Sequence, residues 1–157
     1  MAAPAITDAI AAVVARVEAI APTVEPAARF RRFGEAAPPS TRTKRGFDVE
    51  FMGHTRDISN EGQGIQTHGQ ADRVARLDLV VEYPAGRQEK ALETTLAVDS
   101  ELLLRALGRS AVWTSTPVRR CTARTTVDRQ GAEGEDGLPG VILLVVTVDV
   151  QYRDIEG

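Results

Sequence analysis

The sequence predicts an α+β fold in which one mainly antiparallel sheet of four strands carries two helices on a single face. Two segments with helical apolar stripes and four segments with alternating polar and apolar residues lead to this prediction. Their order along the chain is helix, strand, strand, helix, strand, strand. The chain has 157 residues, about the size of one domain, so residues 1–157 are predicted to form a single domain.

The first helix is predicted close to the start of the chain. Isoleucine and valine recur there at intervals of three and four residues, which places them on one stripe of a helix, and Pro22 ends the pattern. No basic stretch precedes the segment, and three charged residues interrupt it, so neither a signal peptide nor a membrane span is expected. The apolar stripe consists of Ile6, Ile10, Val13, Val17 and Ile20.

The first two strands are predicted on either side of a long polar loop. Apolar and charged residues alternate in residues 47–51, and the alternation resumes in residues 73–83, "RVARLDLVVEY". The connection between them, residues 53–70, is rich in glycine and polar residues. A loop of this length within a compact domain is more often functional or disordered than a plain turn.

The second half of the chain repeats the order of helix and two strands. A helix is predicted in residues 88–108, with Gly108 as its C-terminal stop. Strands are predicted in residues 118–128 and 141–153, joined by a second polar loop, residues 129–140. The last strand is apolar on one face and partly apolar on the other, so its first half is expected to be covered on both sides. The helix carries a leucine stripe of Leu92, Leu96, Leu103 and Leu107.

The amino-acid composition indicates what kind of core the protein can form and in which cellular compartment it is made. Aromatic residues make up only 4% of the chain, which leaves the core to smaller aliphatic side chains. A thin core of this kind is often completed by burial against a neighbouring subunit. The single cysteine, Cys121, excludes an intramolecular disulfide and is expected to be a small buried thiol, consistent with synthesis in a reducing cytoplasm.

Motifs for metal binding and catalysis are incomplete. Asp57, Ser59 and Glu61 have the spacing that begins a calcium loop, but His68 occupies the position where a closing glutamate is required. His54 and His68 are therefore interpreted as solvated loop histidines rather than metal ligands. Dinucleotide, phosphate-loop, nucleophile-elbow and zinc-helix motifs are absent from the sequence. The sequence thus predicts no catalytic residue, no metal and no cofactor, and a protein that is not an enzyme.

The most unusual local feature is the basic segment, residues 29–45. It holds six basic side chains and one acid in a chain whose formal net charge is −3. Three interpretations stay open: a solvated loop anchored by Phe30 and Phe33, a contact with an acidic subunit, and a contact with DNA. The basic residues are Arg29, Arg31, Arg32, Arg42, Lys44 and Arg45.

Several segments in a fixed order carry a resemblance to a known family. They are the amphipathic N-terminal helix, "RFRRFGE", a strand ending "LVVEYP", the helix "ALETTLAVDSELLLRAL" and a last strand ending "VDVQYR". In this order the chain resembles the tail terminator proteins of long-tailed bacteriophages and the similar small neck proteins of phage-derived particles. The resemblance covers most of the chain and is one of pattern and element order, without a signature motif.

The resemblance implies a structural protein that forms a homohexameric ring, caps the growing tail tube and offers a surface for joining the head. It implies the tail tube protein and a head–tail connector or neck protein as partners, with DNA passing through the channel without sequence-specific binding. The protein would be made in the cytoplasm of the bacterial host and end up in the virion tail or neck, without a membrane partner.

Within such a ring, the basic segment would form a subunit contact or line the channel. Because arginines in the channel would hold the DNA phosphates, the subunit contact is favoured for most of these charges. The two polar loops would contact the tube or the neck, through Arg56, Asp57, Glu61, Arg129, Glu133, Glu135 and Asp136. The alternative function is a nucleic-acid-binding module that uses residues 29–45 as an arm.

Overall fold

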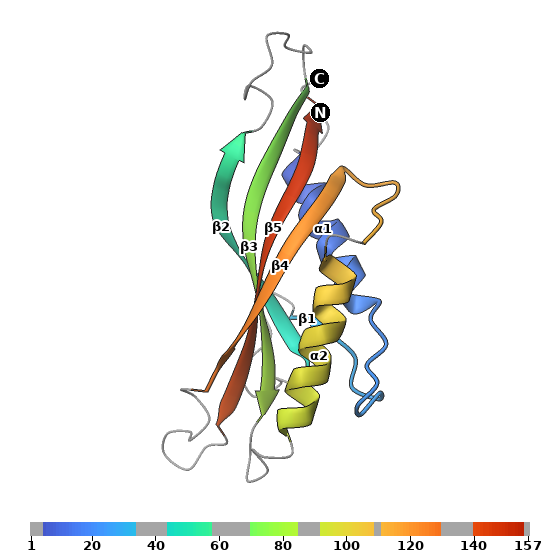
Figure 1. Ribbon diagram of the computed structural model, residues 1–157, viewed down its shortest axis with the longest axis vertical. Coiled ribbons are helices and arrows are strands. Elements are labelled where there is room, and N and C mark those ends of the chain that lie inside the picture. Colours follow the sequence, from blue (N-terminus) through green and yellow to red (C-terminus); the bar gives the residue numbers. More distant parts are fainter. Residues whose placement is uncertain are drawn as a thin grey trace.

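A computed structural model describes residues 5–33, 44–57, 70–84, 92–108, 111–129 and 140–155. Five strands form one long twisted sheet in the order β1-β2-β3-β5-β4, accompanied by two helices (Figure 1). The elements are α1 (Ala5–Glu18), β1 (Arg31–Arg32), β2 (Gly46–Asp57), β3 (Gln70–Pro84), α2 (Leu92–Leu107), β4 (Val118–Asp128) and β5 (Val141–Ile155). The predicted α+β class is confirmed.

The four predicted strands pair antiparallel as expected, but the predicted number of strands is wrong. A fifth strand, β1, lies within the basic segment and pairs with the start of β2 in parallel, which makes the sheet mixed. Arg31 lies opposite Gly46 and Arg32 opposite Phe47, and the N–H of Phe33 donates to the carbonyl of Phe47 at 2.9 Å. Two residues are too few to show an alternating pattern, which is why the sequence does not reveal this strand.

Both helices lie on one face of the sheet. Each of them contacts β5, whose even-numbered residues from Ile142 to Tyr152 are buried. The odd-numbered residues point to the other face, which no helix of the described chain covers. Val141, Leu143 and Val145 are half-buried on that face, so the expected cover on both sides of this strand is not found among the described residues.

The helices bury the stripes that the sequence predicts, with a small rotation in α1. All four leucines of the α2 stripe are buried. In α1, Val13 and Val17 are buried, but Ala9 and Val14 take the remaining core positions, and the three isoleucines pack at the margin of the core. A Cβ at Gly108 would lie 2.4 Å from the carbonyl oxygen of Leu104, so the helix ends at a residue without a side chain.

Two strands extend into the segment predicted as the first polar loop. β2 continues to Asp57 and β3 begins at Gln70, so residues 53–57 belong to the sheet and not to a loop. The register shifts between Phe51 and His54, and Gly53 has a φ of +106° there. A bulge with a glycine at positive φ interrupts the alternation of side chains without ending the strand, which hides the extension from the sequence pattern.

Candidate functional site

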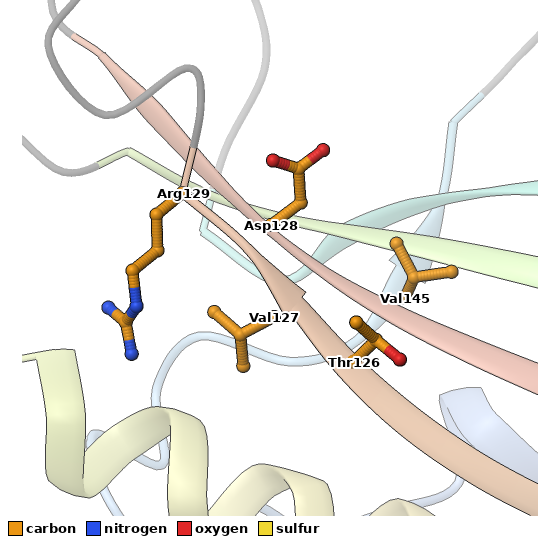
Figure 2. Close-up of a pocket in the computed structure, with 5 residues that line it drawn as sticks. All are labelled: Thr126, Val127, Asp128, Arg129 and Val145. Carbon is orange, nitrogen blue, oxygen red and sulfur yellow. The ribbon is translucent and has the colours of Figure 1, made fainter.

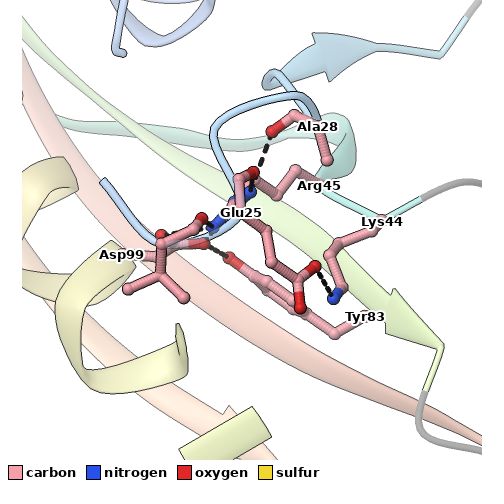
Figure 3. Close-up of polar contacts among 7 residues, drawn as sticks. Glu25, Ala28, Lys44, Arg45, Tyr83 and Asp99 are labelled. Carbon is pink, nitrogen blue, oxygen red and sulfur yellow. Dashed lines mark hydrogen bonds and ion pairs between the residues drawn. The ribbon is translucent and has the colours of Figure 1, made fainter. Parts of the chain in front are cut away.

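Arg45 lies in the core rather than on the surface. Its side chain is fully buried, and its guanidinium donates to the carboxylate of Asp99 on α2 with N–O distances of 2.6 and 3.0 Å. It also donates to three main-chain carbonyls within residues 24–28, which follow α1. The hydroxyl of Tyr83 on β3 donates to the same carboxylate at 2.7 Å, as Figure 3 shows. Arg45 thus joins α2, β3 and the segment after α1.

This buried network changes the interpretation of the basic segment. A guanidinium with no exposed surface and with its hydrogen bonds inside the subunit is not available to a neighbouring subunit or to DNA. The structure therefore gives Arg45 an internal role in place of the predicted contact or channel role. Burial, followed by the negative charge of Asp99, raises the pKa of the Tyr83 hydroxyl far above its usual value, so Tyr83 remains a hydrogen-bond donor.

The remaining basic residues divide into paired and exposed groups. Lys44 forms an ion pair with Glu25, which adds a second link between the basic segment and the chain after α1. Arg29, Arg31 and Arg32 are exposed, the last two as the edge strand β1. Arg42 lies outside the described residues. The exposed positive charge of the described segment is therefore concentrated at and just before β1.

The helix-free face of the sheet carries ordered charge pairs on its two central strands. Arg76 on β3 donates twice to the carboxylate of Asp149 on β5, at 2.9 and 3.2 Å. Arg153 on β5 donates to the carboxylate of Asp72 on β3 at 3.1 Å. Cross-strand pairs of this kind hold the side chains in a fixed arrangement. These four charges are consequently neutralised within the subunit, whereas Asp78 on the same face accepts a hydrogen bond from the Thr147 hydroxyl.

The outer strands of the same face carry unneutralised charges of opposite sign. Asp48 and Glu50 on β2 are exposed, and we call them the acidic flank. Arg120 and Arg124 on β4 are exposed at the opposite side of the sheet, and we call them the basic flank. In the described chain these four side chains form no ion pair, although Arg120 donates to the side-chain oxygen of Gln151 at 3.0 Å. On this face, charge is thus segregated between β2 and β4, whereas the exposed arginines of β1 lie beside β2.

The predicted tube or neck contact residues do not form one cluster in the described chain. Arg56 and Asp57 end β2 and lie opposite the first residues of β3, whereas Arg129 follows β4. These two ends of the sheet are about 30 Å apart, since nine residues of β3 separate the corresponding rows. Arg129 forms an ion pair with Glu93 on α2 at 2.7 Å. The other predicted residues, Glu61, Glu133, Glu135 and Asp136, lie outside the described residues.

A shallow, open depression lies at the end of β4. In Figure 2, the side chains of Val127 and Arg129 point toward α2, and that of Asp128 points away from it. The lining therefore wraps around a strand edge, and its polar groups do not converge on one point. Such a shape is unlike the concave sites that bind small molecules. The lining residues are Thr126, Val127, Asp128, Arg129 and Val145.

His54 lies in a strand and not in a loop, although it is exposed as predicted, and His68 lies outside the described residues. Its Nε2 lies 2.6 Å from the hydroxyl oxygen of Tyr152 on β5, and the ring of Phe51 packs edge-on against it with centroids 5.4 Å apart. Burial raises the pKa of the Tyr152 hydroxyl. The bulge at Gly53 brings His54 to this position, which the alternation of residues 47–51 does not reveal.

Cys121 is buried on β4, as predicted, and burial raises the pKa of its thiol to about 12. The native protein should therefore react with iodoacetamide at pH 8 at least roughly a hundredfold more slowly than the unfolded protein, because the thiolate is the nucleophile. Mass spectrometry of timed samples in buffer and in denaturant measures both rates, with glutathione as the reference thiol. Equal rates in the two conditions would show that the thiol is accessible in solution.

Comparison of the sequence with models of known protein families and with curated proteins finds no match. Within the described ranges, no group of three or more histidine, cysteine, aspartate and glutamate side chains is placed to hold a metal ion. None of the described helices is long and apolar enough to cross a membrane. The surfaces of the sheet are therefore the features from which function can be argued.

Proposed function

We propose that this chain is a structural protein of a bacteriophage tail, of the tail terminator kind. It assembles into a ring at the end of the tail tube, stops polymerisation of the tube and provides the surface to which the head is joined. The proposal starts from the resemblance in element order described above. The observation that carries it is the segregation of charge between the acidic flank on β2 and the basic flank on β4.

Segregated charge favours head-to-tail assembly. A subunit whose two sides carry opposite charges can bind the next copy through different surfaces, and a series of such contacts closes into a ring if the rotation between subunits allows. The helix-free face adds a second argument. It exposes half-buried apolar side chains beside neutralised ion pairs, a composition suited to contact with another protein.

The first experiment is the oligomeric state of the purified protein. Light scattering on a sizing column, at low and moderate salt, is expected to give one oligomer larger than a dimer, and negative-stain images should show closed rings with a central hole. Because the tail tube can promote ring formation, the measurement is repeated with the tail tube protein of the same phage. A monomer that neither assembles nor binds the tube would contradict the proposal.

The exposed arginines of β1 provide a prediction for assembly. Replacing both Arg31 and Arg32 with glutamate should reduce the fraction of subunits that assemble into rings. The change reverses the charge of β1, which is exposed at the edge of the sheet. The deficit relative to the wild type should shrink as salt is raised, since screening weakens both attraction and repulsion. Arg105→Glu, at an exposed site on α2, is the control. Unchanged assembly of the double variant would show that β1 is not part of the subunit contact.

A second candidate function is nucleic-acid binding through the basic segment. The exposure of Arg29, Arg31 and Arg32 favours it, whereas the burial of Arg45 and the pairing of Lys44 reduce the charge available. A titration with double-stranded DNA distinguishes the two functions. Steep loss of affinity with rising salt would support the arm, and no binding at low salt would exclude it.

A further inference from the structure

Two long strand edges in the described sheet have no neighbouring strand. Among the described residues, β1 pairs with β2 only at Gly46 and Phe47, so no described strand lies beside residues 48–57 of β2, and we call this its free edge. β4 is the last strand on the opposite side and pairs with β5 alone. A free edge presents N–H and C=O groups that can pair with a strand of another chain.

The hydrogen bonds of β2 show which groups face its free edge. The carbonyl of Phe47 accepts a bond from β1, so it points away from β3. Since main-chain groups alternate in direction along a strand, those of Val49 and Phe51 point the same way. The N–H of Val49 is bonded to the carboxylate of Asp48, the preceding residue, at 2.8 Å. Val49 and Phe51 are thus positioned to pair with an added strand.

The register of the sheet places opposite charges at the two ends of one row on the helix-free face. Glu50 lies opposite Asp78, Asp78 opposite Thr147, and Thr147 opposite Arg124. Within the row, the Thr147 hydroxyl donates to the Asp78 carboxylate at 2.9 Å. Glu50 and Arg124 are exposed at its ends. If a second copy is placed beside the first in the same orientation, the row continues across the contact, with Arg124 of one copy next to Glu50 of the other.

The next row lies on the helix-covered face, and the side chains at its two ends are complementary in shape. It ends at Phe51 on β2 and at Ala123 on β4. Phe51 is 51% exposed, one of the few large apolar side chains of the described residues left in solvent. A small residue of a neighbouring strand opposite Phe51 leaves room for the aromatic ring and would cover part of it.

We propose that β4 of one copy pairs antiparallel with the free edge of β2 in a second copy, so that the sheet continues head to tail and Arg124 opposes Glu50 of that copy. The directions agree, because β2, β3, β5 and β4 alternate in direction and β4 therefore runs opposite to β2. The inference rests on the proposed ring and names the strands that form its subunit contact.

Pairing of like edges is disfavoured, which selects the head-to-tail contact. Two β2 edges would bring Asp48 and Glu50 together, and two β4 edges would bring Arg120 and Arg124 together. Like charges directly opposite each other destabilise paired strands. A two-fold dimer through either edge would therefore be unfavourable, whereas the heterologous contact places each acidic flank beside a basic flank.

The contact ends where β1 begins. Arg31 and Arg32 occupy the edge beside Gly46 and Phe47, so an added strand can pair only with the part of β2 beyond them. In the register above, Val127 and Asp128 at the end of β4 would fall on the edge positions that β1 occupies, so this end of β4 has to bend away from the sheet and pass beside the two arginines of the second copy. The exposed arginines of the basic segment would then border the contact and add to its charge complementarity.

Charge exchange between two variants tests the contact. Glu50→Arg alone and Arg124→Glu alone should each raise the dissociation constant of the oligomer about tenfold or more at low salt, because each places like charges opposite each other. An equimolar mixture of the two variants should recover assembly, since alternating copies restore one arginine and one glutamate at every contact. Glu101→Arg on α2, with the same change in charge, should assemble as the wild type does.

The outcomes separate this inference from the proposed function. Rings formed by the wild type and by both single variants would overturn the β2–β4 contact and leave the ring intact. Absence of any wild-type oligomer, with and without the tail tube protein, would overturn both. Hydrogen exchange of the wild type provides a check that needs no variant. The amides of Val49 and Phe51 should exchange more slowly in the oligomer than in the diluted monomer, and equal rates would also overturn the contact.

Discussion

Replacing Asp99 with alanine is expected to lower the free energy of unfolding by about 3–5 kcal/mol, because a buried charge would lose its partner. Arg45 would keep its three main-chain carbonyl acceptors but would have no counter-charge in a site from which water is excluded. The Tyr83 hydroxyl would lose its acceptor as well. Arg45 also has a φ of +67°, an unfavourable conformation for a residue with a side chain, which the surrounding contacts must hold.

Urea denaturation followed by circular dichroism measures this effect, at a concentration where the protein is a monomer. Glu101→Ala, two residues further along α2 and exposed, should change the free energy of unfolding by about 0.5 kcal/mol or less. A double variant, Arg45→Met with Asp99→Leu, should be more stable than Asp99→Ala because it leaves no buried charge. An unfolding midpoint of Asp99→Ala equal to that of the wild type would mean that Arg45 is solvated in the native state.

The elements that the sequence predicts well are those whose burial is periodic. The leucine stripe of α2 and the alternation of β5 each extend over many residues, so the period reports the buried face directly. The two-residue β1 is too short for a period, and the bulge at Gly53 breaks the alternation of β2. Both features depend on hydrogen bonds with distant segments, which no local pattern encodes.

The role of Arg45 could not be read from its neighbours in the sequence. Five other basic residues precede it within the basic segment, and a run of this kind is most often a solvated surface. Its partner, however, left a signal. Asp99 falls on the apolar stripe of α2 between Leu96 and Leu103, at intervals of three and four residues. An acid on an otherwise apolar stripe requires a buried partner, and a basic residue elsewhere in the chain is the obvious candidate.

Replacing Leu103 with alanine is expected to cost about 2–5 kcal/mol of unfolding free energy. Leu103 is fully buried where α2 packs on the sheet, and the lost methyl groups would leave a cavity that small aliphatic neighbours cannot fill without moving the helix. Because α2 also carries Asp99, a displaced helix would weaken the contact with Arg45, so the loss should fall in the upper part of this range.

Leu104, the half-buried residue that follows, provides the matched control for Leu103. Leu104→Ala removes the same atoms from the same helix, and with less of its side chain buried it should cost about 1 kcal/mol or less. Urea unfolding curves of both variants at monomer concentration measure the difference, and higher concentrations would mask it, since assembly adds stability by mass action. Equal losses would mean that α2 does not bury the face assigned to it. A larger loss for Leu103 would show that this side chain lies in the core, on the same helix that carries Asp99.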